Sequence, residues 1–171
     1  EEGLSCLQDS GLASLQIIFN VFRQDAMQEL LPKAAANDVG IIVRLPLASG
    51  LLSGKFKANQ QFVESDHRNY NRDGQAFSVG ETFSGLPMNK GIELVDELRQ
   101  WAPADTDLAA FALRWVLDHP QVSSVIAGAS KAQHVTANCL AAAKPSLSAK
   151  THQQLFEFYQ QQVKQHIRGH I

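Results

Sequence analysis

VGIIVRLPLASGLLSGKF, residues 39–56, is the stretch that decides the fold. It opens with an apolar, β-branched run from Gly40 to Val43, which is typical of a strand buried on both faces in a parallel sheet. Pro46 prevents further pairing because proline has no N–H to donate. The residues beyond it are rich in glycine and serine and include Lys55, a combination that suits an anion held by backbone N–H groups and one ammonium. Many strand-to-helix loops carry glycine and serine for turn geometry alone, so both interpretations stay open at this point.

The length and charge of the chain narrow the class of protein. With 171 residues and 44% hydrophobic composition, we expect one domain with its own core. The net charge of −2 arises from 15 basic and 17 acidic residues without charged blocks, which excludes a basic groove for nucleic acid and a polybasic membrane patch. No apolar run has the length of a membrane span, and the first residues do not resemble a signal peptide. We therefore predict a cytoplasmic protein that binds neither nucleic acid nor membrane.

The cysteines and histidines show no spacing that suits a metal. Cys6 and Cys139 lie far apart, and neither has a second thiol or a histidine at the separation that zinc sites use. We interpret both as buried thiols, and we predict neither a disulfide framework nor a metal site.

Strands and helices alternate along the chain, which is the pattern of an α/β fold with parallel strands. The first predicted elements are the tail of a helix over residues 1–9 ended by Ser10 and Gly11, a buried strand at Leu15–Phe19, a helix from Asp25 to Asn37 with Pro32 shortening its first turns, and the strand at Gly40–Arg44. A long aperiodic loop over 57–89 follows, then a helix at Gly91–Trp101, a helix capped by Asp105 or Thr106, a strand at Val122–Ala127, a helix that Ser130 and Gln133 open as a capping box, and a last helix over 148–168. Because the chain opens without Met inside a helix, we expect that its start is not a natural domain boundary.

A second strand leads into a second polar loop. Gly128, Ser130 and Lys131 stand between the predicted strand at Val122–Ala127 and the next helix. Free N–H groups, the positive end of a helix dipole and a lysine suit a phosphate. Two such loops after two parallel strands favour an extended anionic ligand over a simple turn.

Five segments together resemble the C-terminal part of the aldo-keto reductases. They are LQIIFNVFR, RLPLASGLLSGKF, DHRNYNRDG, FALRWVLDHP and VIAGASKAQHVTANCLAA. The resemblance implies part of a TIM-type (β/α)8 barrel, incomplete here with about three parallel strands plus helices, in a family that reduces aldehydes and ketones with NADPH. It also implies a single partial barrel domain over 1–171, with 57–89 as the cofactor and substrate loop and 148–168 as the C-terminal helix.

The resemblance assigns cofactor-binding positions. Gln16 matches a strand glutamine at the nicotinamide carboxamide, and Arg44 stands where the family often stacks an aromatic ring on the nicotinamide. Its charge beside an oxidised nicotinamide is unfavourable. The remaining matches are Pro46, Leu47, Ala48, Ser49, Leu51, Ser53 and Lys55 around the pyrophosphate, Tyr70 and Arg72 as a pair closing over the cofactor, and Gly128, Ser130, Lys131, His134 and Asn138 at the adenosine end, where His134 departs from the usual Arg or Gln.

The family's catalytic Asp, Tyr, Lys and His lie on earlier strands, and this chain shows no counterpart for them. The resemblance therefore implies a chain that supplies the cofactor-binding half and has no catalytic residue of its own, with a small carbonyl compound as substrate if an N-terminal half is supplied. Two alternatives stay open: a non-enzymatic NADP(H)-binding or assembly module, which would associate with itself or with the missing half through its open sheet edges, and an inactive truncated product.

Overall fold

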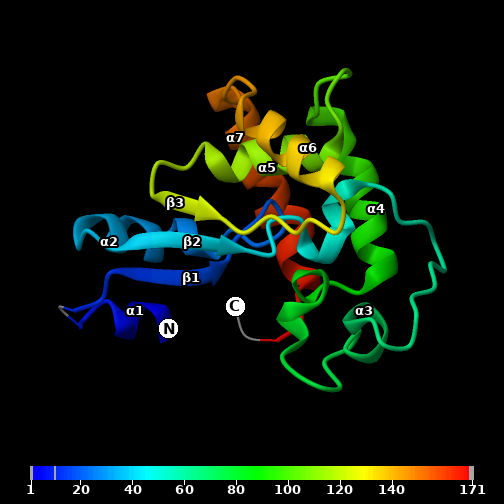
Figure 1. The fold of residues 1–171 in the computed structure, drawn as a ribbon, viewed down its shortest axis with the longest axis horizontal. Helices are drawn as coiled ribbons and strands as arrows, with labels where there is room; N and C mark the ends of the chain where they lie inside the picture. Colours follow the sequence, from blue (N-terminus) through cyan, green and yellow to red (C-terminus); the bar gives the residue numbers. More distant parts are fainter. Residues whose placement is uncertain (1, 10, 170–171) are drawn as a thin grey trace.

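Three parallel strands form an open sheet at the centre of the fold (Figure 1). The computed structural model describes residues 2–9 and 11–169. The strands are β1 (Ser14–Ile18), β2 (Gly40–Arg44) and β3 (Val122–Val125), in the order β1-β2-β3. β1 pairs with β2 from Ser14↔Gly40 to Ile18↔Arg44, and β2 pairs with β3 with a register shift between Ile41 and Ile42.

Helices surround this sheet. The α-helices are α1 (Glu2–Cys6), α2 (Leu30–Ala36), α3 (His67–Tyr70), α4 (Met88–Leu98), α5 (Leu108–Leu117), α6 (Ala132–Ala142) and α7 (Ala149–Phe158). Short 3-10 helices are η1 (Asp25–Met27), η2 (Ala48–Ser53), η3 (Val79–Glu81), η4 (Phe83–Gly85), η5 (Arg99–Trp101) and η7 (Lys164–His166), and η6 (Tyr159–Val163) is a π-helix that continues α7. In Figure 1, α5, α6 and α7 lie beyond the β3 side of the sheet, and α1 lies beyond the β1 side.

The central strand is the one that the opening stretch predicts. Ile41 and Val43 are fully buried in β2, and the strand keeps its expected bounds. The prediction of a buried strand at Leu15–Phe19 is wrong in its burial, because β1 is an edge strand and Gln16 on it is exposed. An edge strand has a partner on one side only, so its other side is covered only by what packs on it. The third strand ends two residues earlier than expected, at Val125.

Several helix starts differ from the sequence prediction. The cap of α5 is Asp107, whose side chain accepts a hydrogen bond from Ala110 N, and not Asp105 or Thr106. The cap position of α6 is Lys131, without a side-chain cap, so the predicted capping box at Ser130 is wrong. α4 begins at Met88 inside the end of the expected loop. The last helix, predicted to start at 148, begins at Ala149, and the Ser148 hydroxyl caps it by accepting a hydrogen bond from Thr151 N.

The first helical segments also differ. α1 ends at Cys6, and Glu1 and Ser10 of the predicted helix end lie outside the described residues. The predicted helix from Asp25 to Asn37 is divided into η1 and α2, which places Pro32 in the first turn of α2, where its missing N–H costs nothing.

Asp25 does not cap a helix; it joins η1 to the far end of the chain. Its carboxylate accepts hydrogen bonds from the Tyr159 hydroxyl and from Lys164 Nζ, the latter at 2.6 Å. Burial, and then the hydrogen bond to Asp25, raise the pKa of Tyr159 above its usual range. A general acid needs a lowered phenol pKa, so Tyr159 has a structural role here.

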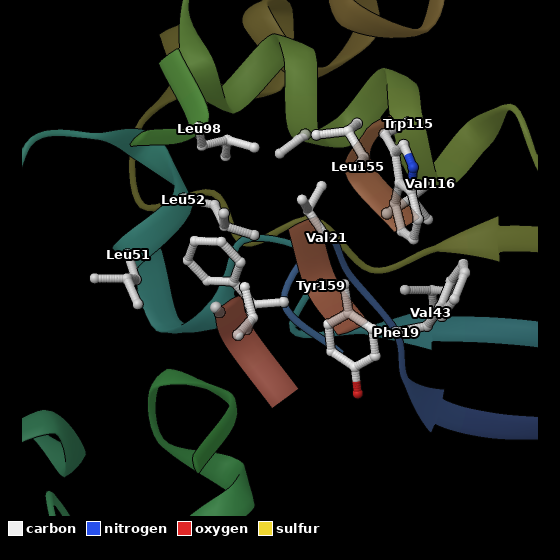
Figure 2. Close-up of a cluster of buried hydrophobic side chains, with 14 of the residues drawn as sticks. Phe19, Val21, Val43, Leu51, Leu52, Leu98, Trp115, Val116, Leu155 and Tyr159 are labelled. Atoms are coloured by element: carbon white, nitrogen blue, oxygen red, sulfur yellow. The ribbon is translucent and has the colours of Figure 1, made fainter. Parts of the chain in front are cut away.

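The core lies between η2, the segment after β1, and helices α5 and α7. Figure 2 shows Leu52, Phe19, Trp115 and Leu155 from these elements packing in one cluster. Trp115 and Leu52 are at most 1% exposed, and the rings of Phe19 and Trp115 lie 5.0 Å apart. Burying aromatic side chains of this size gives the core most of its hydrophobic stabilisation.

Hydrogen bonds to Asp118 link the end of α5 to the start of α7. Its nearly buried carboxylate accepts hydrogen bonds from Arg114 Nε (3.0 Å), Leu147 N (2.8 Å) and His152 Nε2 (3.0 Å). Burial works against the charged carboxylate, but the hydrogen bonds from Leu147 and His152 outweigh it and lower the pKa of Asp118.

The cysteine prediction is wrong: Cys6 and Cys139 are both exposed free thiols. Cys139 lies on α6, whose only buried residue is Ala141, so most of this helix is not covered. Across residues 2–9 and 11–169, no helix has the length and apolar character needed to cross a membrane.

Candidate functional site

The carboxyl ends of the three strands lie at one edge of the sheet, where both predicted anion loops begin (Figure 1). Leu47, at the start of the first loop, and Ala127, at the start of the second, pack on one small cluster of apolar side chains formed by Ala110, Leu113 and Ala141. Ile126 N also donates to Val43 O (2.8 Å), which holds the second loop against the end of β2. The structure therefore brings the beginnings of the two loops together.

The first loop contains a left-handed turn. Ala48, Ser49 and Gly50 have φ angles of 48°, 57° and 91°, and Leu45 has a φ of 52°. Residues other than glycine in this region cost on the order of 1 kcal/mol each or more and persist only where the surroundings hold them. Fully buried Ala48 and Leu52 anchor the turn in the core. Such backbone strain concentrates at functional sites.

A second left-handed turn lies against the first. Phe83, Ser84 and Gly85 have φ angles of 52°, 57° and 84°, and Phe83 and Ser84 are fully buried. This turn belongs to a segment that we call the strap, residues 72–86, which runs from the end of α3 almost to α4.

Two polar side chains join the turns. Asn20 Nδ2 donates to Leu45 O and to Ser84 Oγ, both at 2.9 Å. Ser49 Oγ donates to Glu81 O (3.2 Å) and accepts from Phe83 N (3.3 Å). Because buried polar groups that lose a partner are costly, these bonds fix each turn relative to the other.

Sequence reasoning missed Asn20 and Ser84 as site residues. Ser-Gly-Leu occurs at 49–51 and 84–86, where the Ser and Gly have positive φ angles, but it also occurs at 10–12, so this repeat alone does not single out the second turn.

Arg44 at the end of β2 pairs with Glu81 of the strap through two hydrogen bonds. Hydrogen bonding to Glu81 raises the pKa of Arg44, and the same bonds lower the pKa of Glu81, with smaller contributions from the charges of Arg23 and His67. The stacking predicted for Arg44 stays a prediction, and in the structure the charge of Arg44 is balanced by the Glu81 carboxylate.

The other predicted residues of the first loop differ in whether their side chains are free to contact a ligand. Ser53 Oγ already donates to Gly50 O (2.7 Å), and Pro46 and Leu51 are buried, so these three shape the loop. Lys55 is exposed and has no ion-pair partner in the part of the chain that the structure describes, so its ammonium is available to a ligand.

Tyr70 and Arg72 lie at the end of α3 and the start of the strap. Tyr70 is 46% exposed and meets the ring of Phe77 edge-on at 6.2 Å. Arg72 Nε donates to Arg68 O (3.3 Å). Arg68 in turn pairs with Asp66, and its hydrogen bond lowers the pKa of Asp66 to about 2. The predicted contact of Tyr70 and Arg72 with a ligand is not tested by this arrangement.

The second loop is open to solvent. Gly128, Ser130 and Lys131 are exposed, and no heavy atom lies within 4 Å of the position that a Cβ at Gly128 would take. Ser130 N donates to His134 Nδ1 (3.3 Å), so the predicted pair Ser130 and His134 are in contact at the start of α6. Asn138 follows one turn later and is partly buried. Gln16, by contrast, lies on β1, and β2 separates this strand from β3, which leads into the second loop.

Among residues 2–9 and 11–169, no three His, Cys, Asp or Glu side chains are grouped as a metal site would need. The chemistry that the site offers is recognition of an anion by backbone N–H groups, hydroxyls and lysines.

Comparison with known proteins matches this chain over most of its length. The family model described as Aldo/keto reductase family matches residues 4–160. The chain is 29% identical over 126 residues to a protein of Arabidopsis thaliana named probable voltage-gated potassium channel subunit beta, which covers 70% of this chain and 35% of that protein. It is 29% identical over 121 residues to L-glyceraldehyde 3-phosphate reductase of Escherichia coli K12, and this alignment covers 71% of this chain and 34% of that protein. The chain thus spans about a third of the length of these curated relatives.

Solved structures show the same fold. The glycerol dehydrogenase AKR11B4 from Gluconobacter oxydans superposes with a TM-score of 0.69 at 23% identity, over 92% of this chain and 44% of that chain. The aldo-keto reductase AKR11C1 from Bacillus halodurans in its holo form superposes with a TM-score of 0.62 at 24% identity, over 90% of this chain and 45% of that chain. The predicted fold, three parallel strands and helices of a partial TIM-type barrel, is confirmed.

Proposed function

This chain belongs to the aldo/keto reductase family, and we propose that it supplies the part of an oxidoreductase that binds NADPH. In such an enzyme the cofactor supplies or takes up the hydride that converts a carbonyl compound to an alcohol and back. The observation that supports the proposal is that Leu47 and Ala127, at the starts of the two loops, pack on the same apolar cluster at the carboxyl ends of the strands. NADPH carries a pyrophosphate and a separate 2′-phosphate, so two anion-binding loops suit its two separated anionic groups.

The residues present suit this ligand. The first loop offers exposed Lys55, next to a turn whose Ala48 and Gly50 N–H groups donate to Leu45 O and Leu47 O. The second loop offers exposed Lys131, open space at Gly128 and the N-terminus of the 11-residue helix α6. Lys131 would distinguish the 2′-phosphate of NADPH from the hydroxyl of NADH.

A fluorescence titration of the chain with NADPH tests the proposal. We expect saturable binding that Lys55→Met and Lys131→Met each weaken on the order of tenfold, since each removes one charged hydrogen bond to a phosphate. Lys131→Met should also remove the preference for NADPH over NADH. Lys33→Met is the matched control, because Lys33 lies on α2 and pairs with the exposed Glu29. No saturable binding by the wild-type chain would contradict the proposal.

We propose further that the chain associates with a partner along β3 and α6. Within the described residues β3 has a neighbouring strand on one side only, and Ile126 after it and Val135 and Leu140 on α6 are 52%, 54% and 63% exposed. An open strand edge and exposed apolar side chains each favour association. The partner would be the missing half of a barrel or a second copy of this chain, and only the former would restore reduction of a small carbonyl compound.

The second candidate function is a non-enzymatic NADP(H)-binding or assembly module. Similarity to a protein named as a probable potassium channel subunit and the same exposed face of α6 favour it. Reductase activity on mixing the chain with an N-terminal half from a relative would support the enzyme, whereas cofactor binding without activity would support the module. The exposed free thiols suit a reducing compartment and support the proposed cytoplasmic location.

A further inference from the structure

Arg168, which follows η7, contacts both ends of the strap. Its backbone N and its Nε donate to Gly85 O at 3.1 and 3.0 Å. Nη2 donates to Leu86 O and to Arg72 O, both at 3.3 Å, and Nη1 pairs with Asp73 at 2.6 Å. A planar guanidinium spreads five N–H donors over three nitrogens and can reach several separated carbonyl oxygens at once, whereas the three donors of a lysine lie on a single nitrogen.

The backbones themselves approach closely at this contact. A Cβ at Gly85 would lie 2.7 Å from Arg168 O, and a Cβ at Gly169 would lie 2.8 Å from Val79 Cγ1. Both glycines have positive φ angles, 84° and 82°. The fit of residues 167–169 on the strap therefore requires glycine on each side, and the contact is more specific than a surface ion pair.

The contact falls on the strained left-handed turn of the strap. Gly85 is the last residue of that turn, and the two residues before it hold the loop after β2: Ser84 Oγ accepts from Asn20, and Phe83 N donates to Ser49. A strained turn keeps its shape only where its surroundings determine it. Arg168 supplies the bonds on one side of the turn, and Asn20 and Ser49 are on the other.

We propose that Arg168 is a positioning residue for the cofactor site. By holding the turn Phe83–Gly85 in place, it keeps Ser49 and the loop at 45–56 in the conformation that binds an anion, without touching the ligand itself. The inference rests on the proposed function of that loop, and it adds a dependence on a segment more than a hundred residues further along the chain.

The experiment compares Arg168→Met, Arg168→Lys and the control Lys164→Met in the 171-residue chain. Lys164 lies in the same part of the chain but pairs with Asp25 and not with the strap. We measure the dissociation constant for NADPH, the hydrogen exchange of backbone amides and the melting temperature. Arg168→Met should weaken NADPH binding on the order of tenfold and speed exchange in both 72–86 and 45–56, because it removes several charge-assisted hydrogen bonds. Arg168→Lys should restore part of the affinity, and Lys164→Met should lower the melting temperature with little change in affinity.

The outcomes separate this inference from the proposed function. If the wild type binds NADPH and Arg168→Met binds it equally well, the inference is wrong and the proposed function stands. Equal weakening by Lys164→Met would indicate general loosening of α7 and its continuation, and would also overturn it. If the wild type does not bind NADPH, the proposed function fails, and faster exchange at 45–56 in Arg168→Met then decides the structural coupling alone. Should Arg168→Met fail to fold, Asp73→Asn, which removes a single ion-pair partner, is expected to give a smaller effect in the same direction, and no effect would count against the inference.

Discussion

Arg44 and Glu81 form a two-point ion pair that joins the end of the central strand to the strap, with Nη2 and Oε1 2.5 Å apart. The two residues are 37 positions apart in sequence and each side chain is about 30% exposed, at 33% and 29%. The pair neutralises the only charge that the strand carries into the site, and it orders the strap above the strand end.

Removal of the Glu81 carboxylate should destabilise the fold. We expect Glu81→Gln to lower the free energy of unfolding by about 1 to 2 kcal/mol, because Arg44 keeps its charge and loses its partner while partly buried. Urea denaturation measures this change. Glu29→Gln, which breaks the exposed pair with Lys33, should have little effect, and equal effects of the two variants would contradict the role given to Glu81.

The close approach of α4 to η2 depends on Gly91. A Cβ there would lie 2.5 Å from Leu51 Cδ2, and Leu51 is 1% exposed, so it has little room to move. We expect Gly91→Ala to cost about 1 to 2 kcal/mol by overpacking, despite the better helix propensity of alanine. Gly128→Ala, where a Cβ meets open space, should change the free energy of unfolding by less than about 0.5 kcal/mol. A tolerated Gly91→Ala would show that the two elements are less tightly packed than the structure has them.

Stability should depend on pH through His119. Burial, and then the charge of His152, lower the pKa of His119, and its Nδ1 donates to Trp115 O (2.9 Å). The unfolded chain therefore takes up this proton first, so the contribution of neutral His119 is complete above about pH 6.5 and is lost as the pH falls below it. The pKa of Asp118 is also lowered in the fold, so its contribution to stability is lost only as the pH falls below about 4. Urea midpoints between pH 7.5 and 5 should fall in the wild type and fall less in His119→Gln; parallel slopes would exclude His119 as the cause.

Local patterns predicted the elements that are set by neighbouring residues. The strand at Gly40–Arg44 followed from an uninterrupted apolar run, and α7 begins within one residue of the start predicted at 148. The start of α5 was missed because Asp105, Thr106 and Asp107 can all cap, and only the three-dimensional position of Ala110 N selects Asp107.

The parts of the site that were missed depend on distant residues. The bond from Asn20 to Ser84 joins positions 64 apart, and Arg168 meets the strap 82 to 96 positions away, so no local pattern contains either contact. Gln16 shows the reverse error: its strand was found, but its exposure depends on what packs on the face of the sheet that carries its side chain, which is not a property of the strand sequence.

One dinucleotide that spans both loops at the carboxyl ends of the strands would perturb backbone amides in each loop, which nuclear magnetic resonance of the isotope-labelled chain measures. On titration with NADPH, we expect the backbone amides of Ser49, Gly50, Gly128 and Ser130 to shift together and to fit one dissociation constant. Shifts confined to one loop, two different dissociation constants, or no shift at any of the four amides would contradict it.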